Sequence, residues 1–524
     1  MARVRLTSAL DDLDDWPGHL LQTDSYTVLA RNASTFSYRL GGDSPFAGMV
    51  VTVTGSGFRW QGGDAVGGNI SKIVIRDGST TVLTIDRLPA DTVASSLQVF
   101  HDNVFGWSTP NGNQNPNGTA AFSHLLSGND VIIGTNGDDN RVLPGLQAGH
   151  DRFSMKGGDD QVWAGAGNDT INGGAGWDRL TYDSTARSEG DGAWRGIDLT
   201  IGSTPGSGTV RDCWGDLDRF SNMESFAGSR FADRFTGGAK REEFLGLAGN
   251  DTINGRGDQD TVRYDDDYWS GGTRGIVADL QTSVVNGSIR GQIRDGFGST
   301  DTVINIERVV GTRYADRFVG SSERNEFSGG EGKDYYHGTG GQDGDRLRFD
   351  RQFTDANQTG ISVDLRKASN QINNDGFGNR ETALSIEQVV GSRQADRIIM
   401  NNADNVIVGH DGRDTLNGLG GNDTFEFWDR SHIGDNDRIV NFTASGGAGN
   451  VDQLYFETGN FNGMSKTLSL VNGNSATEAR DQFIFNPAND VLYWDPDGTG
   501  AQARIAIATL VGVDALSAAN FDLV

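Results

Sequence analysis

From residue 125 onward, apolar residues recur at a fixed interval of nine, between short runs of glycine and polar residues. Within residues 146–181, four successive nonapeptides carry glycine at position 4, aspartate at position 6 and an apolar residue at position 8. The frame returns at 228–263, 311–346 and 391–426, and two leading units, LLSGNDVII and GTNGDDNRV, fill residues 125–142. A fixed period of this length predicts a stack of structural repeats.

Each nonapeptide is predicted to form a tight turn followed by a three-residue strand. Glycines in the early positions permit positive φ, and the middle strand residue faces inward because strand side chains alternate. With two nonapeptides per turn, the predicted inward residues are Phe153, Val162, Ile171, Leu180, Phe235, Phe244, Ile253, Val262, Ile398, Ile407, Leu416 and Phe425. Such a core is one side chain thick, so apolar burial alone stabilises it little.

The aspartates at position 6 are predicted to stack one turn apart. Two nonapeptides per turn bring together residues 18 apart, and these pairs are Asp151 with Asp169, Asp160 with Asp178, Asp233 with Asp251, and Asp396 with Asp414. Bare carboxylates at such spacing repel, whereas Ca²⁺ takes about 6–8 oxygens from carboxylates and turn carbonyls. The candidate calcium ligands are Asp130, Asp139, Asp151, Asp160, Asp169, Asp178, Asp233, Asp251, Asp260, Asp316, Asp334, Asp343, Asp396, Asp414 and Asp423.

The opposite row of three blocks contains weaker candidate ligands, namely Glu242, Asn325 and Asn405. They are predicted to face, in turn, Asp260, the broken fourth unit of the third block near Asp343, and Asp423. An amide supplies no charge to a cation. We therefore expect fuller calcium occupancy on the row that contains Asp151, Asp233, Asp316 and Asp396.

Units such as GGAGWDRLT, GLAGNDTIN and GLGGNDTFE resemble the hemolysin-type calcium-binding nonapeptide of RTX proteins, G-G-x-G-x-D-x-U-x. The nonapeptides cover about a third of the chain. The resemblance implies parallel β-rolls that bind several Ca²⁺ ions. It also implies export through an ATP-binding-cassette type I exporter, and a secreted, extracellular or cell-surface location in a Gram-negative bacterium.

A longer repeat encloses the nonapeptides. The blocks begin at residues 146, 228, 311 and 391, which gives spacings of 82, 83 and 80 residues. Each insert between blocks has a strand-like segment, GIDLTI, GIVADL or GISVDL, followed by a loop rich in Gly and Asn. Glu224, Glu307 and Glu387 occupy equivalent positions before the next block, where a ligand role competes with a solvated or Arg-paired one. The period predicts a modular rod of similar units.

The two flanking regions have different patterns. Segments such as TFSYRL and KIVIR alternate apolar and polar residues and predict an N-terminal antiparallel β domain, as a sandwich or prism. Near the other end, GDNDRIVNF, VDQLYF and the final NFDLV resemble the C-terminal region and uncleaved export signal of type I secreted RTX proteins, and DPDGTG predicts a hairpin turn. The expected all-β organisation is an N-terminal domain (1–124), roll blocks (125–181, 228–263, 311–346 and 391–426), β inserts (182–227, 264–310 and 347–390) and a C-terminal β cap with the export signal (427–524).

Composition agrees with a cation-binding protein. The 524 residues include 75 Gly, 71 Asp or Glu, 44 Lys or Arg and one Cys, with a net charge of −27. This charge argues against nucleic acid as a partner, and the single Cys213 excludes an internal disulfide. No apolar run is long enough for a membrane span, and residues 1–20 lack the apolar core of a cleavable export signal.

No recognisable catalytic motif is present. The chain lacks H-E-x-x-H, G-x-S-x-G and the P-loop, and no cofactor other than Ca²⁺ is expected. The favoured function is a non-catalytic surface or matrix protein, acting in a surface layer, filament, biofilm or adhesion, with self-association or surface polysaccharide as its partner. The alternatives are a secreted polysaccharide-active enzyme and a carbohydrate-binding adhesin that uses Trp16, Trp60 and Trp107 of the N-terminal domain.

Overall fold

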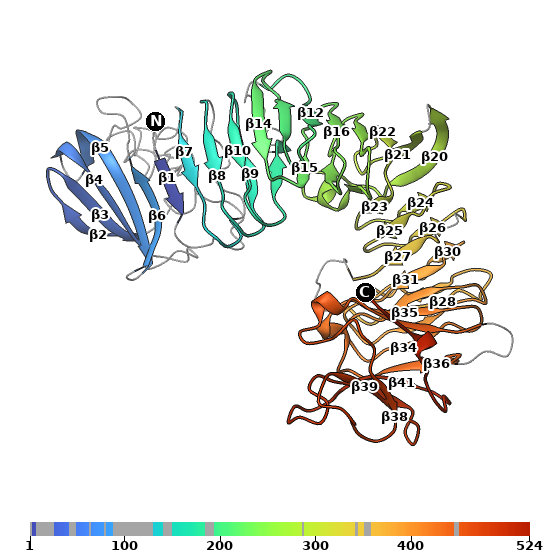
Figure 1. Ribbon diagram of the computed structural model, residues 1–524. Helices are drawn as coiled ribbons and strands as arrows, with labels where there is room; N and C mark the ends of the chain where they lie inside the picture. Colours follow the sequence, from blue (N-terminus) through green and yellow to red (C-terminus); the bar gives the residue numbers. More distant parts are fainter. Residues whose placement is uncertain are drawn as a thin grey trace. The chain divides into compact units, whose positions relative to one another are not determined.

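The computed structural model describes residues 3–6, 26–40, 49–61, 64–77, 80–86, 129–139, 149–183, 193–285, 288–340, 344–350, 358–444 and 450–524 (Figure 1). Trp16, Trp107 and Asp343 lie outside these ranges. The chain divides into two compact units, Met1–Thr261 and Val262–Val524. Regular structure in the described ranges is almost entirely β-strand, with a few short 3-10 helices, and none of the helices there has the length and apolarity needed to cross a membrane.

The first unit begins with an antiparallel sheet, as the alternating segments predict. Its strands run in the order β2–β3–β4–β5–β6–β1. Their bounds are Tyr26–Arg31, Thr35–Leu40, Val50–Gln61, Asp64–Asp77, Thr80–Asp86 and Arg3–Leu6. Phe36, Tyr38 and Leu40 are buried along one strand while Arg39 is exposed. Strand β1 also pairs in parallel with β7 (Val131–Ile133), so the antiparallel sheet continues directly into the first nonapeptide strand.

The nonapeptides of the first unit form a parallel β-roll with the predicted register. One sheet stacks β7, β8 (Arg152–Ser154) and β10 (Thr170–Asn172), and the other stacks β9 (Gln161–Trp163), β11 (Arg179–Thr181), β15 (Ser225–Ala227) and β17 (Glu243–Leu245). Phe153 lies beside Ile171 and Val162 beside Leu180, and all four side chains are buried. The twelve predicted inward residues are all buried.

The insert of the first unit is part of the roll. Strands β12 (Asp198–Ile201), β13 (Gly208–Arg211) and β14 (Leu217–Ser221) form an antiparallel triplet. The outer strands of this triplet pair in parallel with nonapeptide strands on both sides, β14 with β10 and β12 with β16 (Arg234–Thr236). Strand β16 then pairs with β18 (Thr252–Asn254). The insert therefore carries one sheet from the first block to the second without a break.

The second unit repeats this arrangement. One stack consists of β20 (Val277–Val285), β24 (Arg317–Val319), β26 (Tyr335–His337) and β30 (Thr382–Leu384). A second stack consists of β23 (Arg308–Val310), β25 (Glu326–Ser328), β27 (Arg346–Arg348), β31 (Gln388–Val390), β33 (Val406–Val408), β35 (Thr424–Phe427) and β37 (Gln453–Phe456). Its first insert adds β21 (Ser288–Arg294) antiparallel to β20, and β22 (Thr300–Ile304) antiparallel to β21.

The last block passes into the C-terminal cap through both of its sheets. One sheet follows β28 (Ser362–Asp364), β32 (Arg397–Ile399), β34 (Thr415–Asn417), β36 (Asp437–Val440) and β41 (Ile505–Leu510), with β29 (Ile372–Asn374) antiparallel at its start. It ends in β40 (Val491–Asp495), β39 (Gln482–Asn486) and β38 (Leu470–Asn472). Strand β42 (Phe521–Leu523), from the predicted export signal, pairs with β37. Residues 496–504, which include most of the DPDGTG segment, connect the antiparallel strands β40 and β41, as the hairpin prediction requires.

Candidate calcium sites

The position-6 carboxylates form ladders, each rung of which is a hydrogen bond between successive turns. The Oδ1 atom of each aspartate accepts the backbone N–H of the equivalent residue one turn earlier. The N···O distance is 2.7 Å from Asp151 to Asp169 and 2.9 Å from Asp160 to Asp178. The pairs Asp233–Asp251, Glu242–Asp260, Asp316–Asp334, Asp396–Asp414 and Asn405–Asp423 repeat this contact at 2.8–3.0 Å. The predicted spacing of 18 is confirmed in all seven pairs.

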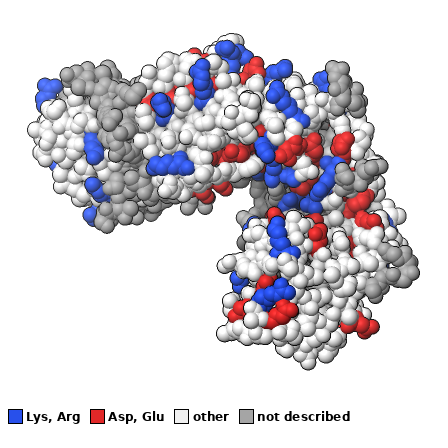
Figure 2. Space-filling view, viewed as in Figure 1, with Lys and Arg blue, Asp and Glu red and all other residues white. Residues whose placement is uncertain are grey.

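All the candidate ligands within the described residues are buried, although the chain is strongly acidic. The aspartates of the frame are at most 4 % exposed, and Glu242, Asn325 and Asn405 at most 2 %. On the face drawn in Figure 2, Lys and Arg are as conspicuous as Asp and Glu. Much of the acidic excess is therefore inside the protein, where burial of an uncompensated charge is costly.

Where position 1 of the nonapeptide is glycine, it makes room for the ladder carboxylate of the same nonapeptide. A Cβ built on Gly246 would lie 2.5 Å from Oδ2 of Asp251, and a Cβ on Gly409 would lie 2.3 Å from Oδ2 of Asp414. Such distances are well inside van der Waals contact. Part of the glycine content thus follows from the need to place a carboxylate directly over the turn, in addition to the positive φ that some positions adopt.

The residue opposite Asn325 lies in the predicted broken unit, but it is not one of the candidate ligands. Asn325 faces Asp345, whose Oδ1 accepts the Asn325 N–H at 2.8 Å, across 20 residues instead of 18. Asp345 directly precedes β27, as each ladder aspartate directly precedes its strand. Two additional residues in the loop of this unit displace the glycine frame without moving the strand. The ladder position is therefore set by the distance to the strand and not by the distance from the first glycine.

The ladders also contain carboxylates that the nonapeptide frame did not nominate. Asp218, Glu381, Asp437 and Asp452 accept the backbone N–H of Asp169, Asp334, Asp414 and Asp423 at 2.9–3.2 Å. Two of the equivalent insert glutamates act alike, because Glu224 accepts from Asp178 at 3.0 Å and Glu387 from Asp345 at 2.9 Å. Glu381 and Asp452 directly precede strands β30 and β37, whereas Asp437 begins β36 and Asp218 is the second residue of β14. The shared sequence feature is an acid at or near the start of a short strand, in the segments DRF, ETA, DRI and DQL.

The second carboxylate oxygen divides the ladder residues into two groups. In the first nonapeptide of several blocks, a Ser or Thr at position 2 donates hydrogen bonds to the carboxylate. Ser229 N–H donates to Asp233 Oδ2 at 2.7 Å, and Ser229 Oγ donates to Asp233 Oδ1 at 2.8 Å. Thr312 and Ser392 hold Asp316 and Asp396 in the same way. In the other group the Oδ2 atom is buried and accepts no hydrogen bond within the described residues: Asp160, Asp169, Asp178, Asp345, Asp414 and Asp423.

Burial makes the free carboxylates poor acids. It raises the pKa of Asp160 to about 8, and burial together with Asp218 raises the pKa of Asp169 to about 9. Burial, followed by the charge of Asp437, likewise raises the pKa of Asp414 to about 9. A divalent cation beside these oxygens reverses this preference and keeps the carboxylates ionised. Carboxylate oxygens such as these are the hard ligands that Ca²⁺ prefers.

Asn405 shows how a loop closes without a cation. The Asn405 side-chain amide is oriented so that its nitrogen faces acceptors and its oxygen faces donors. In this orientation Nδ2 donates to the carbonyl oxygens of Ala403 and Asn401 at 3.0 and 3.1 Å. These carbonyls belong to positions 4 and 2 of the nonapeptide. The Asn405 amide group thus binds the turn carbonyls directly. In a nonapeptide with aspartate at position 6, a cation would lie between the carboxylate and these carbonyls.

Comparison with known proteins identifies the class. A family model described as the RTX calcium-binding nonapeptide repeat (4 copies) matches residues 126–140, 156–184, 236–268, 310–344 and 399–427. The chain therefore contains RTX repeats, and repeats of this family bind calcium. The matched segments amount to about a quarter of the chain. Among solved structures, the extracellular lipase LipA from Serratia marcescens matches at 13% identity over 93% of this chain and 82% of that chain, with a TM-score of 0.18. A search of curated proteins finds no match.

Proposed function

We propose that this chain is an exported, non-catalytic protein of the cell surface or extracellular matrix, which folds when it meets extracellular Ca²⁺. The observation that carries the proposal is the set of buried carboxylate oxygens that accept no hydrogen bond from the described part of the chain, such as Oδ2 of Asp160, Asp169 and Asp414. In a calcium-poor cytoplasm these ladders oppose folding, which suits passage through a type I exporter. Outside, millimolar Ca²⁺ meets or exceeds the dissociation constants of about 10⁻⁴–10⁻³ M found in extracellular modules. Ion binding then contributes directly to folding, because the unfolded chain has no preformed site.

Charge supports a role in assembly. Each bound Ca²⁺ offsets two of the 27 net negative charges, so about a dozen ions would bring the chain close to neutrality. Near neutrality, mutual repulsion between copies falls and association becomes easier. Self-association in a surface layer, filament or biofilm is therefore the form of the function that we propose.

Folding is tested by circular dichroism and calorimetry on the full chain. With chelator at neutral pH, we expect a reduced β spectrum and a low or absent melting transition, both restored by Ca²⁺ in the millimolar range. Mg²⁺ at equal concentration is the control, because its strict octahedral geometry and slow dehydration suit these loops poorly. A native spectrum and an unchanged melting temperature in chelator would show that calcium does not fold the chain.

Assembly is tested by sedimentation and electron microscopy with and without Ca²⁺. We expect ordered assemblies that form with Ca²⁺ and dissolve with chelator. If calcium-loaded protein remains monomeric at all accessible concentrations, self-association is wrong while calcium-driven folding still stands.

Exposed tryptophans favour glycan binding as a second candidate function. Trp194 is 66% exposed and Trp269 67% exposed, and each lies shortly before the first strand of an insert. Tyr268 packs edge-on against Trp269 at 5.2 Å, with the Arg313 guanidinium 4.4 Å from the Tyr268 ring centroid. Flat aromatic faces beside a cation are suited to stacking on sugars. By contrast, Trp60 of the N-terminal domain packs on Phe36 at 5.0 Å and donates to the Asn32 carbonyl oxygen.

The glycan candidate is tested on an array with the calcium-loaded protein. Trp194→Ala and Trp269→Ala should each lower binding, with melting temperatures that match the parent because both side chains are exposed. Binding that both variants retain would point away from the insert tryptophans, and turnover of a bound glycan would favour the polysaccharide-active enzyme instead.

A further inference from the structure

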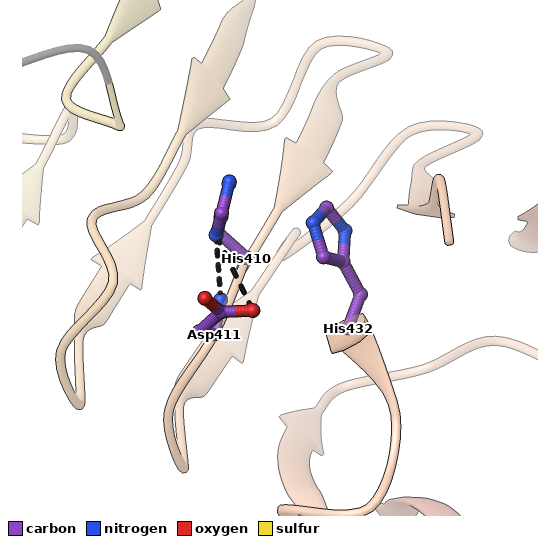
Figure 3. Close-up of side chains that lie close together, drawn as sticks. All are labelled: His410, Asp411 and His432. Atoms are coloured by element: carbon purple, nitrogen blue, oxygen red, sulfur yellow. Dashed lines mark hydrogen bonds and ion pairs between the residues drawn. The ribbon is translucent and has the colours of Figure 1, made fainter. Parts of the chain in front are cut away.

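A cluster of two histidines and an aspartate lies in the second unit, outside the carboxylate ladders. His410 and Asp411 belong to the turn before β34, and His432 ends the 3-10 helix η4 (Arg430–His432) that follows β35. The potential ligand atoms of the three side chains all lie within 4.8 Å of one another. Figure 3 shows the His432 ring turned toward His410 and the Asp411 carboxylate below His410. The imidazole centroids are 4.4 Å apart.

Packing alone does not satisfy the polar atoms of this cluster. Oδ1 of Asp411 is buried, lies 3.6 Å from His410 Nδ1 and accepts no hydrogen bond within the described residues. His410 Nδ1 accepts the Asp411 backbone N–H at 2.8 Å, and His432 Nδ1 accepts the Trp428 N–H at a long distance of 3.4 Å. A buried carboxylate oxygen without a donor, next to two imidazoles, needs a partner that binds nitrogen and oxygen together.

We propose that His410, Asp411 and His432 form a binding site for a divalent transition-metal cation of the zinc class. Neutral imidazole nitrogens and a carboxylate oxygen are the ligands that Zn²⁺ and its neighbours accept, whereas Ca²⁺ prefers oxygen alone. His432 is 5% exposed, and a neutral imidazole is the form that ligates metals. The ladders and this cluster therefore select different ions.

A second carboxylate is placed to orient His410. Oδ2 of Asp350 lies 4.0 Å from His410 Nε2. If Nδ1 ligates the metal, it gives up the bond from the Asp411 amide and leaves Nε2 protonated toward Asp350. A metal-bound histidine that donates its other N–H to a carboxylate is a common outer-shell arrangement. Arg348 is hydrogen-bonded to Asp350 through both Nε and Nη2, which fixes the carboxylate beside the cluster.

The site would fasten the C-terminal cap to the last nonapeptide block. His410 and Asp411 lie in the nonapeptide 409–417, and His432 lies after the last nonapeptide, at the entrance to the cap. A metal bound to the folded chain and not to the unfolded chain raises stability by mass action. This role is independent of export, assembly and glycan binding.

The test uses full-length protein kept in millimolar Ca²⁺ throughout, so that the ladders are loaded and only the new site titrates. Zn²⁺ binding is measured by calorimetry, and Co²⁺ serves as a spectroscopic probe of nitrogen ligation. We expect one equivalent of Zn²⁺, visible Co²⁺ bands, and a rise in the melting temperature that a zinc-selective chelator reverses. His410→Asn and His432→Gln should each weaken Zn²⁺ binding at least about tenfold.

Two precautions keep the result decisive. Asn tolerates the left-handed backbone of His410, where φ is 72°, so His410→Asn should fold even if the buried His432→Gln variant does not. The matched control is His150→Gln, because His150 also lies in a nonapeptide but is exposed, and this variant should bind Zn²⁺ like the parent. Absence of stoichiometric Zn²⁺ binding, or equal affinity in the parent and His410→Asn, would overturn the proposal.

Discussion

Oδ1 of Asp169 accepts the backbone N–H of Asp151 at 2.7 Å, one turn of the roll away. This bond means that the main chain of one turn positions the carboxylate of the next. The other oxygen of Asp169 is left buried and without a hydrogen bond in the described part of the protein. The candidate ligands therefore come together only when the turns are stacked, which couples ion binding to the fold of the roll.

Asp160→Asn should affect the calcium-free and calcium-loaded protein in opposite directions. The substitution removes a buried charge whose Oδ2 accepts no hydrogen bond within the described residues, so the melting temperature in chelator should rise. The same substitution removes a charged ligand, so the stabilisation gained from Ca²⁺ should fall by about 1–3 kcal/mol. The new amide can donate to turn carbonyls, as Asn405 does in its own loop. Calorimetry with chelator and with Ca²⁺ measures both changes.

The adjacent Asp159 provides a matched control. It is exposed, and its Oδ1 accepts the Trp177 N–H at 2.7 Å, a bond that asparagine retains. Asp159→Asn should leave the calcium-dependent gain close to that of the parent. If the two variants lose equal amounts of that gain, general charge and not the ladder position governs calcium binding.

The nine-residue pattern predicts the roll well because each unit contains its own turn, strand and ligand. The pairing of Phe153 with Ile171 and of Asp151 with Asp169 follows directly from two units per turn. The pattern fails where inserts of variable length supply the next rung, as when Asp218 continues the ladder 49 residues after Asp169. It also fails at Asp345, since loop length can change while the strand keeps its place.

Other features had no periodic signal. The Ser229 hydroxyl that holds Asp233 occupies a position where other nonapeptides have Gly, Leu or Lys, so its role depends on the local turn. His410 and His432 are 22 residues apart, and only one of them belongs to a nonapeptide. Their proximity arises from the path of the chain after β35, which no local pattern specifies.

Gly246→Ala should destabilise the roll by about 1–3 kcal/mol, the usual cost of overpacking. Its Cβ would lie 2.5 Å from Oδ2 of Asp251 and would displace that carboxylate from the ladder. Calcium affinity should fall together with the melting temperature. Gly257→Ala is the control, because the nearest heavy atom to its Cβ would be 3.7 Å away. Urea unfolding in Ca²⁺ compares the two variants, and equal losses would contradict a steric role for the first glycine.

Tyr182→Phe should destabilise the protein by about 1–3 kcal/mol in chelator and in Ca²⁺ alike. The Tyr182 hydroxyl donates to Oδ2 of Asp218 at 2.6 Å, and both side chains are at most 2 % exposed. Without the hydroxyl this oxygen loses that donor, whatever occupies the neighbouring sites. Tyr268→Phe alters a ring that is 40% exposed and should be neutral. A destabilisation of the Tyr182 variant that Ca²⁺ fully removes would instead make Asp218 a primary calcium ligand.

Stability without calcium should increase as the pH falls from 9 to 5. Burial raises the folded-state pKa of Asp160 to about 8 and of Asp169 and Asp414 to about 9, from an ordinary 3.8. Between the ordinary pKa and the raised folded-state pKa, the folded chain binds more protons than the unfolded chain. The contribution of these carboxylates to the free energy of unfolding is therefore fully present below about pH 4 and is lost as the pH rises through 8–9. A proton on each carboxylate replaces the missing cation.

With calcium the dependence should have the opposite sign, since protons compete with Ca²⁺ for the same oxygens and affinity rises with pH. The difference in melting temperature between calcium and chelator should therefore widen from pH 5 to pH 9. Calorimetry across this range measures the effect, and Asp169→Asn should flatten the chelator curve while Asp159→Asn should not. A melting temperature in chelator that climbs with pH over this interval would mean that the ladder carboxylates are ionised without an ion, and that calcium is not what their burial requires.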